Sequence, residues 1–401
     1  MSGIVIIGAG QAGSSLAIKL RALGYQGTVT LIGEEPYAPY QRPPLSKTYL
    51  LGEMALERLY LRPEEVYRDQ NIELRLGTQV TAIDPVAQVI SLGAETLSYD
   101  QLALTTGSTP RLLPEAIGGR LQNVFAVRGL ADVDAMRPAF ERGGHVLIIG
   151  GGYIGLEAAA VAAKRGLKVT LVEMADRILQ RVACAETSDY FRALHQSHGV
   201  TLLEGVGLSS LTGTDHVTGA ILSNGATLDI DFALVGVGIQ PNTQLADAAG
   251  LTLNNGIETN ALGQTSQSKI WAAGDCASFP YQGERIRLES VPNAIDQAEV
   301  VAANMLGAQK AYHATPWFWS DQYDVKLQIS GLNQGFENVV TRIGEAGRSH
   351  WYYKAGQVLA VDAMNDPRAY MVAKRLIEAG KTVHSTLLAD PSSDLKTLLR
   401  G

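Results

Sequence analysis

The sequence predicts an α/β protein built from two Rossmann-like dinucleotide-binding domains and a C-terminal α+β domain. One pattern occurs twice: a short apolar run, the motif Gly-x-Gly-x-x-Gly, and then a helical periodicity. The apolar runs are residues 4–7 and 146–149, and the motifs begin at Gly8 and Gly150. After Pro316 the chain changes to short segments of alternating polar and apolar residues, which indicates a different kind of domain.

Each glycine of the motif has its own task. The first permits a sharp turn off the strand, the second lets a pyrophosphate approach the backbone, and the third lets the helix pack close to the sheet. The N-terminus of the following helix offers unpaired N–H groups to an anion. The candidate binding residues in the two turns are Gly8, Gly10, Ala12 and Gly13 in the first, and Gly150, Gly152, Tyr153, Ile154 and Gly155 in the second.

An acid follows each motif at the end of the next predicted strand. Residues 28–33 lead to Glu34, and residues 168–172 lead to Glu173. A carboxylate at this place binds a ribose diol of a dinucleotide. Glycine-rich turns also occur without a ligand, but two complete units in one chain favour two dinucleotides and electron transfer between them.

Composition limits the other functions. The chain has 401 residues, 46% of them hydrophobic, with a formal net charge of −7, which predicts two or three domains and disfavours nucleic acid as a general partner. No apolar run reaches the roughly 18 residues that span a bilayer. The first strand starts at Ile4, which leaves no room for a signal peptide, so we expect a cytoplasmic enzyme. Cys184 and Cys276 are too far apart in sequence to form a recognisable disulfide or metal motif, and no metal site is expected.

The remaining segments of the first part follow strand and helix patterns. Residues 102–104 lead to Thr106 and Gly107, and residues 232–235 lead to a turn that ends at Gly238. Residues 270–273 form a buried strand pattern that ends in Gly274 and Asp275. A long amphipathic helix is predicted from residue 293 to about residue 306.

The C-terminal part shows four strand patterns and a helix. The strands are expected within residues 325–329, 339–343, 350–353 and 358–361. Asp366 and Pro367 start a helix as N-cap and first-turn residue, and Gly380 can end it.

The order of motifs over essentially the whole chain resembles one family. Its most specific parts are Arg-Pro-Pro-Leu-Ser-Lys at residues 42–47 and Pro-Trp-Phe-Trp-Ser-Asp-Gln at residues 316–322. The chain resembles the FAD-dependent, NADH-using ferredoxin reductases of cytochrome P450 and aromatic-ring oxygenase systems, above all the putidaredoxin reductase type, which share a glutathione reductase-like fold. The resemblance implies an FAD domain at 1–108 and 240–317, an NAD domain at 109–239 and a C-terminal domain at 318–401.

The resemblance also implies roles on the FAD side, with FAD bound non-covalently. Val80 matches an adenine-side contact, Arg128 an FAD-contacting arginine, and Asp275 a ligand of a ribityl hydroxyl, although Asp275 has the alternative of a plain turn or helix-cap residue. Val291 precedes the helix whose N-terminus would point at the flavin. The full set beyond the glycine turn is Glu34, Arg42, Lys47, Val80, Thr106, Gly107, Arg128, Gly274, Asp275 and Val291.

Three residues are expected to act in catalysis. The resemblance places Lys47 beside flavin N5, paired with Glu157 in the first turns of the second motif's helix. A cation there would stabilise negative charge on the reduced ring. Trp319 would lie near the flavin if it matches the family's second tryptophan; the alternative is a core aromatic at a domain junction.

The second unit is expected to bind NADH, with Glu173 on the adenosine ribose and Gly238 at the nicotinamide end. A carboxylate repels the 2′-phosphate of NADPH, although Arg177 and Arg181 nearby weaken this inference. No cysteine occurs within residues 40–50, where some related oxidases keep one, so electrons are expected to pass outward to a [2Fe–2S] ferredoxin.

Several alternatives remain at this point. The acceptor is open between a ferredoxin, a rubredoxin, and a quinone or small oxidant. A different class is an NADH-sensing FAD protein resembling apoptosis-inducing factor. Arg285, Arg287 and Lys310 are candidates for a basic docking patch, with scattered solvated charges as the alternative. The chain is expected to be a monomer or homodimer.

Overall fold

The computed structural model describes residues 3–345 and 347–399 and divides the chain into two compact units. The first unit comprises residues 1–42, 54–109 and 239–316, and the second comprises residues 43–53, 110–238 and 317–401. Each unit holds one Gly-x-Gly-x-x-Gly turn. The short segment 43–53, which carries Lys47, belongs to the second unit.

The first unit is built on a mainly parallel sheet in the order β3-β2-β1-β6-β5-β4, with β18 paired to the other edge of β6. The inner strands read as continuous apolar runs because both faces of the sheet are covered. Its strands are β1 (Gly3–Ile7), β2 (Val29–Ile32), β3 (Ile72–Arg75), β4 (Ala82–Asp84), β5 (Val89–Leu92), β6 (Glu95–Leu104) and β18 (Ile270–Ala272).

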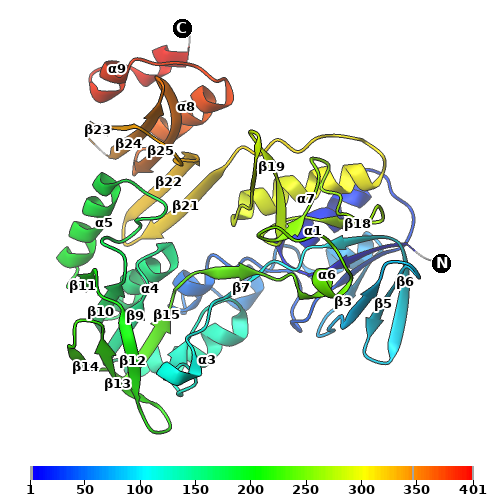
Figure 1. Ribbon diagram of the computed structural model, residues 1–401, viewed down its shortest axis with the longest axis horizontal. Coiled ribbons are helices and arrows are strands. Elements are labelled where there is room, and N and C mark those ends of the chain that lie inside the picture. Colours follow the sequence, from blue (N-terminus) through cyan, green and yellow to red (C-terminus); the bar gives the residue numbers. More distant parts are fainter. Residues whose placement is uncertain (1–2, 346, 400–401) are drawn as a thin grey trace. The chain divides into compact units, whose positions relative to one another are not determined.

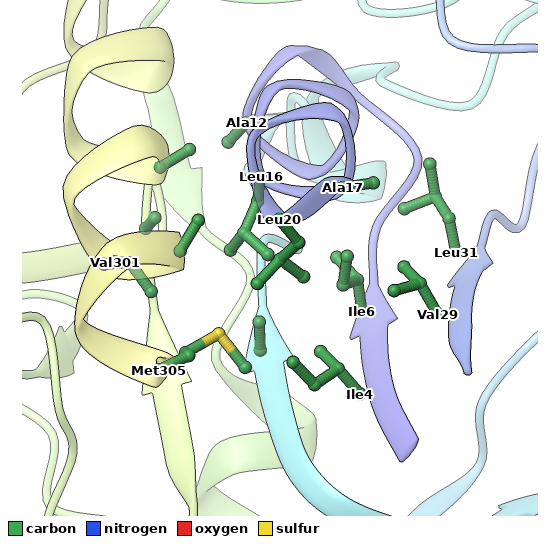
Figure 2. Close-up of a cluster of buried hydrophobic side chains, with 14 of the residues drawn as sticks. Ile4, Ile6, Ala12, Leu16, Ala17, Leu20, Val29, Leu31, Val301 and Met305 are labelled. Carbon is green, nitrogen blue, oxygen red and sulfur yellow. The ribbon is translucent and has the colours of Figure 1, made fainter. Parts of the chain in front are cut away.

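Helices α1 (Gln11–Ala22) and α7 (Val291–Met305) pack together over one face of this sheet. Figure 2 shows Leu16 and Leu20 of α1 between Val301 and Met305 of α7 and the side chains of β1. The helix α7 begins two residues earlier than its sequence pattern predicts, because the Ser290 hydroxyl accepts the Asn293 N–H and caps it.

The other face of the same sheet carries the odd-numbered side chains of β1 and a second apolar cluster. Smaller elements complete the first unit: η2 (Leu56–Arg58), α2 (Glu64–Asp69), β7 (Ser108–Pro110), β16 (Ile239–Pro241), α6 (Gln244–Ala248), β17 (Ile257–Glu258), β19 (Ala277–Tyr281) and β20 (Glu284–Ile286).

The second unit contains a five-stranded parallel sheet in the order β11-β10-β9-β15-β8. Figure 1 labels β11, β10, β9 and β15 of this sheet. A three-stranded antiparallel sheet and a helical turn that is broken at Lys47 accompany it. The elements are η1 (Leu45–Tyr49), η3 (Glu115–Ile117), β8 (Val124–Phe125), α3 (Leu130–Arg142), β9 (His145–Ile149), α4 (Tyr153–Lys164), β10 (Lys168–Glu173), α5 (Ala185–Ser197), β11 (Thr201–Glu204), β12 (Leu208–Gly213), β13 (Val217–Leu222), β14 (Thr227–Asp229) and β15 (Phe232–Val235).

The C-terminal part of the second unit is an antiparallel sheet in the order β21-β22-β25-β24-β23, covered by α8. The predicted cap of α8 is confirmed, since Asp366 accepts the Ala369 N–H at 2.9 Å and Gly380 follows the helix at a positive φ of 59°. The elements are β21 (Trp317–Gln322), β22 (Val325–Gly331), β23 (Asn338–Ile343), β24 (Arg348–Lys354), β25 (Gln357–Met364), α8 (Pro367–Glu378), α9 (Ser385–Ala389) and η4 (Leu395–Leu399).

None of the helices within the described ranges has the length and apolar character that crossing a membrane requires.

Candidate active site

The first glycine turn lies between β1 and α1 and is shaped for a close ligand. A Cβ on Gly8 would stand 2.2 Å from the Thr105 carbonyl oxygen, and one on Gly13 would stand 2.0 Å from the Gly8 carbonyl oxygen. A Cβ on Gly10 would meet no protein atom within 4 Å. The outer glycines therefore allow the backbone to fold tightly, and the middle one leaves open space at the start of α1.

The second turn, between β9 and α4, repeats this geometry. A Cβ on Gly150 would stand 2.4 Å from the Gly236 carbonyl oxygen, and one on Gly155 would stand 2.0 Å from the Gly150 carbonyl oxygen. Gly152, like Gly10, has nothing within 4 Å of its Cβ position. The repetition of tight, open and tight positions in both units fits a pyrophosphate at each turn.

The starts of α1 and α4 also differ electrostatically from the other long helices. Neither has a side-chain cap or an acid in its first turn. The helices α3, α5, α7 and α8 each have a capping side chain or an acid there. Neither α1 nor α4 therefore compensates its positive end with a side chain of its own cap or first turn, which favours an anionic ligand at both.

The two strand-end acids are held differently. Glu173 accepts the Gly151 N–H at 2.7 Å through one carboxylate oxygen and the Ala175 N–H at 2.8 Å through the other. Glu34 is exposed and, within the described part of the chain, receives a single long hydrogen bond of 3.3 Å, from Gln79. The carboxylate of Glu173 is thus fixed beside the second turn, whereas that of Glu34 faces solvent beside the first.

Arg42 lies in the first unit and is engaged by its own neighbours. Its guanidinium donates to Glu35 at 2.5 Å and to the Tyr40 hydroxyl at 3.1 Å. Arg42 therefore helps to fix the loop after β2, and its role in FAD binding stays a prediction.

Gly274 and Asp275 follow β18 at the carboxyl edge of the first sheet. Gly274 has a φ of 82°, its Cβ position lies 3.0 Å from the Ala12 Cβ, and its N–H donates to Gln297 of α7 at 2.9 Å. Asp275 accepts the Ser108 hydroxyl at 2.7 Å. The structure thus brings the first turn, the strand end and the start of α7 with Val291 to the same edge of this unit.

Thr106 and Gly107 stand at the end of β6 and are tied to Asn242. The Thr106 hydroxyl donates to the Asn242 carbonyl at 2.7 Å, and the Asn242 N–H donates to the Gly107 carbonyl at 2.9 Å.

Val80 lies buried among apolar side chains of β1 and β2. Arg128 lies in the second unit, just before α3, and its backbone N–H donates to Asp132 at 2.8 Å.

The second turn is lined by Tyr153, Ile154 and Gly238. Ile154 is 45% exposed, and the Tyr153 ring packs against Phe318 with 4.9 Å between ring centroids. Gly238 has a φ of 98°, and its Cβ position lies 3.8 Å from an Arg181 guanidinium nitrogen. Arg177 donates to the carbonyls of Ala183 and Cys184 and to the Ser188 hydroxyl, so its guanidinium is committed to its own loop.

The ion pair expected from the resemblance is present in the second unit. The Lys47 ammonium lies 2.9 Å from Glu157 Oε1, and the side chains are only 17% and 8% exposed. The segment that carries Lys47 is anchored on both sides: Tyr49 donates to Asp134 of α3 at 3.0 Å, and Arg165 donates to the Leu51 carbonyl at 2.7 Å.

Glu157 is a buried carboxylate whose pKa is raised. Burial raises the pKa of Glu157, and the Lys47 ammonium and the Ser320 hydroxyl, which donates at 2.7 Å, oppose that shift only in part. A carboxylate in such a place depends on each of its donors to stay ionised.

Trp319 is half-buried on β21, within a row of aromatic side chains. Its ring centroid lies 5.6 Å from that of Trp317 and 6.4 Å from that of Phe318. Because Phe318 contacts Tyr153, the row leads to the second glycine turn.

Cys184 and Cys276 are both buried, at 1% and 0% exposure. Burial raises the pKa of both thiols. Neither is a reactive surface thiolate.

Three polar residues of this region received no role in the sequence analysis, although two of them lie in the motif at residues 316–322. Ser320, Gln322 and His195 are fully buried and hydrogen-bonded near Glu157. Ser320 and Gln322 are two residues apart on a strand and so share one face, and this spacing was the signal available in the sequence.

Two glycine turns shaped for a pyrophosphate, each followed by an acid at the end of the next strand, fit an oxidoreductase that uses two dinucleotides. Residues 2–298 match the pyridine nucleotide-disulphide oxidoreductase family, and residues 317–399 match the reductase C-terminal family. The chain belongs to the first family, in the putidaredoxin reductase-like group that also carries the second domain. Members of this family use FAD and NAD(H).

Individual relatives match over nearly the whole chain. Putidaredoxin reductase of Pseudomonas putida is 41% identical over 99% of this chain and 96% of its own length. Rhodocoxin reductase of Rhodococcus erythropolis is 39% identical over 98% and 93%. The solved covalent complex of putidaredoxin reductase and putidaredoxin matches with a TM-score of 0.95 and 39% identity, covering 100% of this chain and 98% of that chain.

Proposed function

We propose that this oxidoreductase takes a hydride from NADH onto non-covalently bound FAD and passes electrons one at a time to a [2Fe–2S] ferredoxin. That ferredoxin would serve a cytochrome P450 or a ring-hydroxylating oxygenase. The proposal is carried by the repeated open position at Gly10 and Gly152, one in each unit, which supports two dinucleotide sites in one chain. The full-length likeness to putidaredoxin and rhodocoxin reductases supports the choice of acceptor.

FAD, when bound, supplies the conversion of a two-electron hydride into single electrons. The residues of this chain bind the two dinucleotides and orient them. The N-terminus of α1 and the exposed Glu34 fit the pyrophosphate and ribose of FAD, and the N-terminus of α4 and the fixed Glu173 fit those of NADH.

The preference for NADH over NADPH follows from Glu173 and Arg177. The carboxylate of Glu173 would repel a 2′-phosphate. Arg177 holds its own loop by donating to several protein acceptors, including the Ala183 and Cys184 carbonyls and the Ser188 hydroxyl, which leaves it poorly placed to attract that phosphate.

We assign Lys47 to the reactive edge of the flavin, with Glu157 as the residue that orients it. A held cation there would stabilise negative charge as the ring is reduced, without reorganisation during the reaction. Trp319 remains a proposed neighbour of the flavin.

The cysteines support an outward electron path. No cysteine lies within residues 40–50, and the two cysteines of the chain, Cys184 and Cys276, are buried. The described residues therefore contain no pair of cysteines that could relay electrons as in a disulfide reductase. The rubredoxin, quinone and sensor alternatives remain outcomes of the test. The cytoplasmic location and the monomeric or homodimeric state stay predictions.

Anaerobic stopped-flow tests the proposal. The flavoprotein is mixed first with NADH and then with a [2Fe–2S] ferredoxin. We expect fast bleaching of the flavin absorbance, followed by ferredoxin reduction that depends on salt concentration. Bleaching without transfer to ferredoxin would leave an NADH oxidoreductase with another acceptor, and no bleaching by NADH or NADPH would reject the hydride step.

A further inference from the structure

A continuous row of buried hydrogen bonds leads away from Glu157 within the second unit. Ser320 contacts Glu157 Oε1 at 2.7 Å, Gln322 Nε2 contacts the Ser320 hydroxyl at 3.2 Å, and Gln322 Oε1 contacts His195 Nε2 at 2.8 Å. His195 Nδ1 then contacts the Tyr323 hydroxyl at 3.1 Å. Glu157, Ser320, Gln322 and His195 are buried, and Tyr323 is half-buried.

Three different elements contribute to this row. Glu157 comes from α4, Ser320 and Gln322 from one face of β21, and His195 from the buried face of α5. Tyr323 lies in the turn between β21 and β22, with a φ of 56°, and the exposed His198 stacks on its ring at 3.7 Å between centroids. A tyrosine at positive φ is held against a steric cost, which its contacts to His195 and His198 help to offset.

The direction of every hydrogen bond is fixed from the Glu157 end. An ionised carboxylate only accepts, so Ser320 must donate to it. The Ser320 oxygen therefore accepts from the Gln322 amide, and the Gln322 carbonyl oxygen accepts from His195 Nε2–H. His195 is then the neutral tautomer whose Nδ1 accepts from Tyr323, and burial keeps this form by lowering the pKa of His195 to about 4.

We propose that Ser320, Gln322 and His195 are positioning residues for Glu157, whose aligned hydrogen bonds keep its carboxylate ionised and oriented toward Lys47. Aligned donors polarise one another, so the row stabilises the negative charge more than its last member would alone. The importance of this row for turnover rests on the proposed role of Lys47 and Glu157 at the flavin; the effect on Glu157 itself does not.

The row works beside two charged groups that act on Glu157. Lys47 on the kinked segment lowers the pKa of Glu157, and Asp321 on β21 raises it. Because burial already raises that pKa, the loss of a donor is expected to move it further upward.

Isotope-edited infrared spectroscopy of the oxidised flavoprotein tests the proposal directly. Glutamate labelled at the side-chain carboxyl is incorporated, and the Glu157 band is identified as the one absent from Glu157→Gln. A pH titration of this band then gives the fraction of Glu157 protonated. We expect Ser320→Ala to shift this titration upward by roughly one pH unit.

The variants His195→Leu, His195→Gln and Tyr323→Phe test the distant part of the row. His195→Leu should shift the titration in the same direction as Ser320→Ala, and His195→Gln should restore it, because a glutamine amide can donate to Gln322. Tyr323→Phe keeps the ring under His198 and should cause a smaller shift. Ser349→Ala is the matched control: it removes a buried, hydrogen-bonded serine on β24 and should leave the Glu157 titration unchanged.

The outcomes separate this inference from the proposed function. An unchanged Glu157 titration in Ser320→Ala, His195→Leu and Tyr323→Phe would overturn the proposal, and a shift in Ser320→Ala alone would reject the row beyond Ser320. The flavin midpoint potential is measured on the same samples. Shifted titrations with an unchanged potential would support the positioning role and reject the assignment of the pair to the flavin.

Discussion

At the scale of single residues, Lys47 is the charge on which the proposed mechanism depends. Removing its ammonium leaves the buried Glu157 carboxylate with the Ser320 hydroxyl as its one remaining donor among the residues that the structure describes, which raises the cost of keeping it ionised. We expect Lys47→Met to slow flavin reduction by NADH roughly 100-fold to 1,000-fold, the range found when a preorganised donor is removed. Stopped-flow bleaching of the flavin measures this rate.

The control for this variant is Lys164→Met on α4. Lys164 also forms an ion pair, with Glu53 at 3.0 Å, but its side chain is 59% exposed, and exposed pairs contribute little. Flavin reduction in Lys164→Met should match that of the unsubstituted protein. Equal rates in all three proteins would reject the role of Lys47.

Glu173 carries the second residue-scale prediction. Glu173→Gln keeps an acceptor for one of the two backbone N–H groups and removes the charge that repels a 2′-phosphate. We expect the ratio of kcat/KM for NADH over NADPH to fall by roughly 10-fold, which corresponds to about 1.4 kcal/mol of discrimination. Steady-state reduction of a dye acceptor with each nucleotide measures it.

Glu204→Gln is the matched comparison. Glu204 is the register partner of Glu173, at the end of the neighbouring strand β11, but its carboxylate is bound by Arg192 and the Ile178 N–H. Its substitution should leave the nucleotide ratio as it was. A ratio that falls in Glu204→Gln and stays constant in Glu173→Gln would contradict the assignment.

At the scale of elements, the two strand–turn–helix units offer a paired prediction. Gly10 and Gly152 have negative φ values, −93° and −81°, and open space at the Cβ position, so alanine fits both without strain. Its methyl group would instead occupy the space proposed for a pyrophosphate. We expect Gly10→Ala to lose FAD during purification, and Gly152→Ala to keep FAD while its KM for NADH rises roughly 10-fold or more.

Flavin content per chain and steady-state kinetics check this pair, and each variant is the control for the other. Far-UV circular dichroism should show both folded. The opposite assignment, with flavin lost from Gly152→Ala, would exchange the two proposed sites.

The same elements explain why much of the fold was predictable. The strand β1, the turn at Gly8 and the helix α1 follow from apolar runs, glycine positions and helical spacing that lie within about 20 residues of one another. The start of α7 was placed two residues late because the capping role of Ser290 precedes the periodic pattern.

The parts that local pattern could not supply are contacts between distant segments. Residues 45–49 have no regular period, and the helical turn there is broken at Lys47, with φ of −128° and ψ of −110°. The pairing of Lys47 with Glu157 came from the resemblance alone. The contacts of Ser320, Gln322 and His195 depend on how α4, α5 and β21 pack, which no single segment encodes.

At the scale of the whole molecule, some of the charged side chains proposed for docking are bound by other protein groups. The net charge is −7, and the proposed basic patch included Arg285, Arg287 and Lys310. Arg285 donates to the Thr259 and Ser278 carbonyls, and Arg287 pairs with Glu289 at 2.5 Å. Both arginines therefore stabilise the first unit, and neither is a simple solvated surface charge.

The pH dependence of overall stability is set in part by a buried cluster between α5 and the C-terminal sheet. Thr187 donates to Asp362 at 2.7 Å and contacts His350 at 2.7 Å, and Tyr352 also donates to Asp362. Burial raises the pKa of Asp362 to about 6 and lowers the pKa of His350 to about 4. The two groups therefore respond to pH in opposite directions.

The signs follow from which state binds the proton more tightly. Asp362 is protonated more readily when folded, so its contribution to stability falls as pH rises from about 4 to about 6. His350 is protonated more readily when unfolded, so its contribution rises over nearly the same range. Together they keep stability nearly constant where each alone would make it change with pH.

Asp362→Asn should remove the contribution of Asp362, which lowers stability as pH rises, and keep that of His350, which raises it. Its free energy of unfolding relative to the unsubstituted protein should increase by up to about 3 kcal/mol between pH 4 and pH 6 and stay constant above. His350→Gln should show the opposite trend, which makes the two variants controls for each other. Thermal unfolding at saturating FAD across this range measures both, and parallel pH profiles in all three proteins would show that neither group titrates differently on folding.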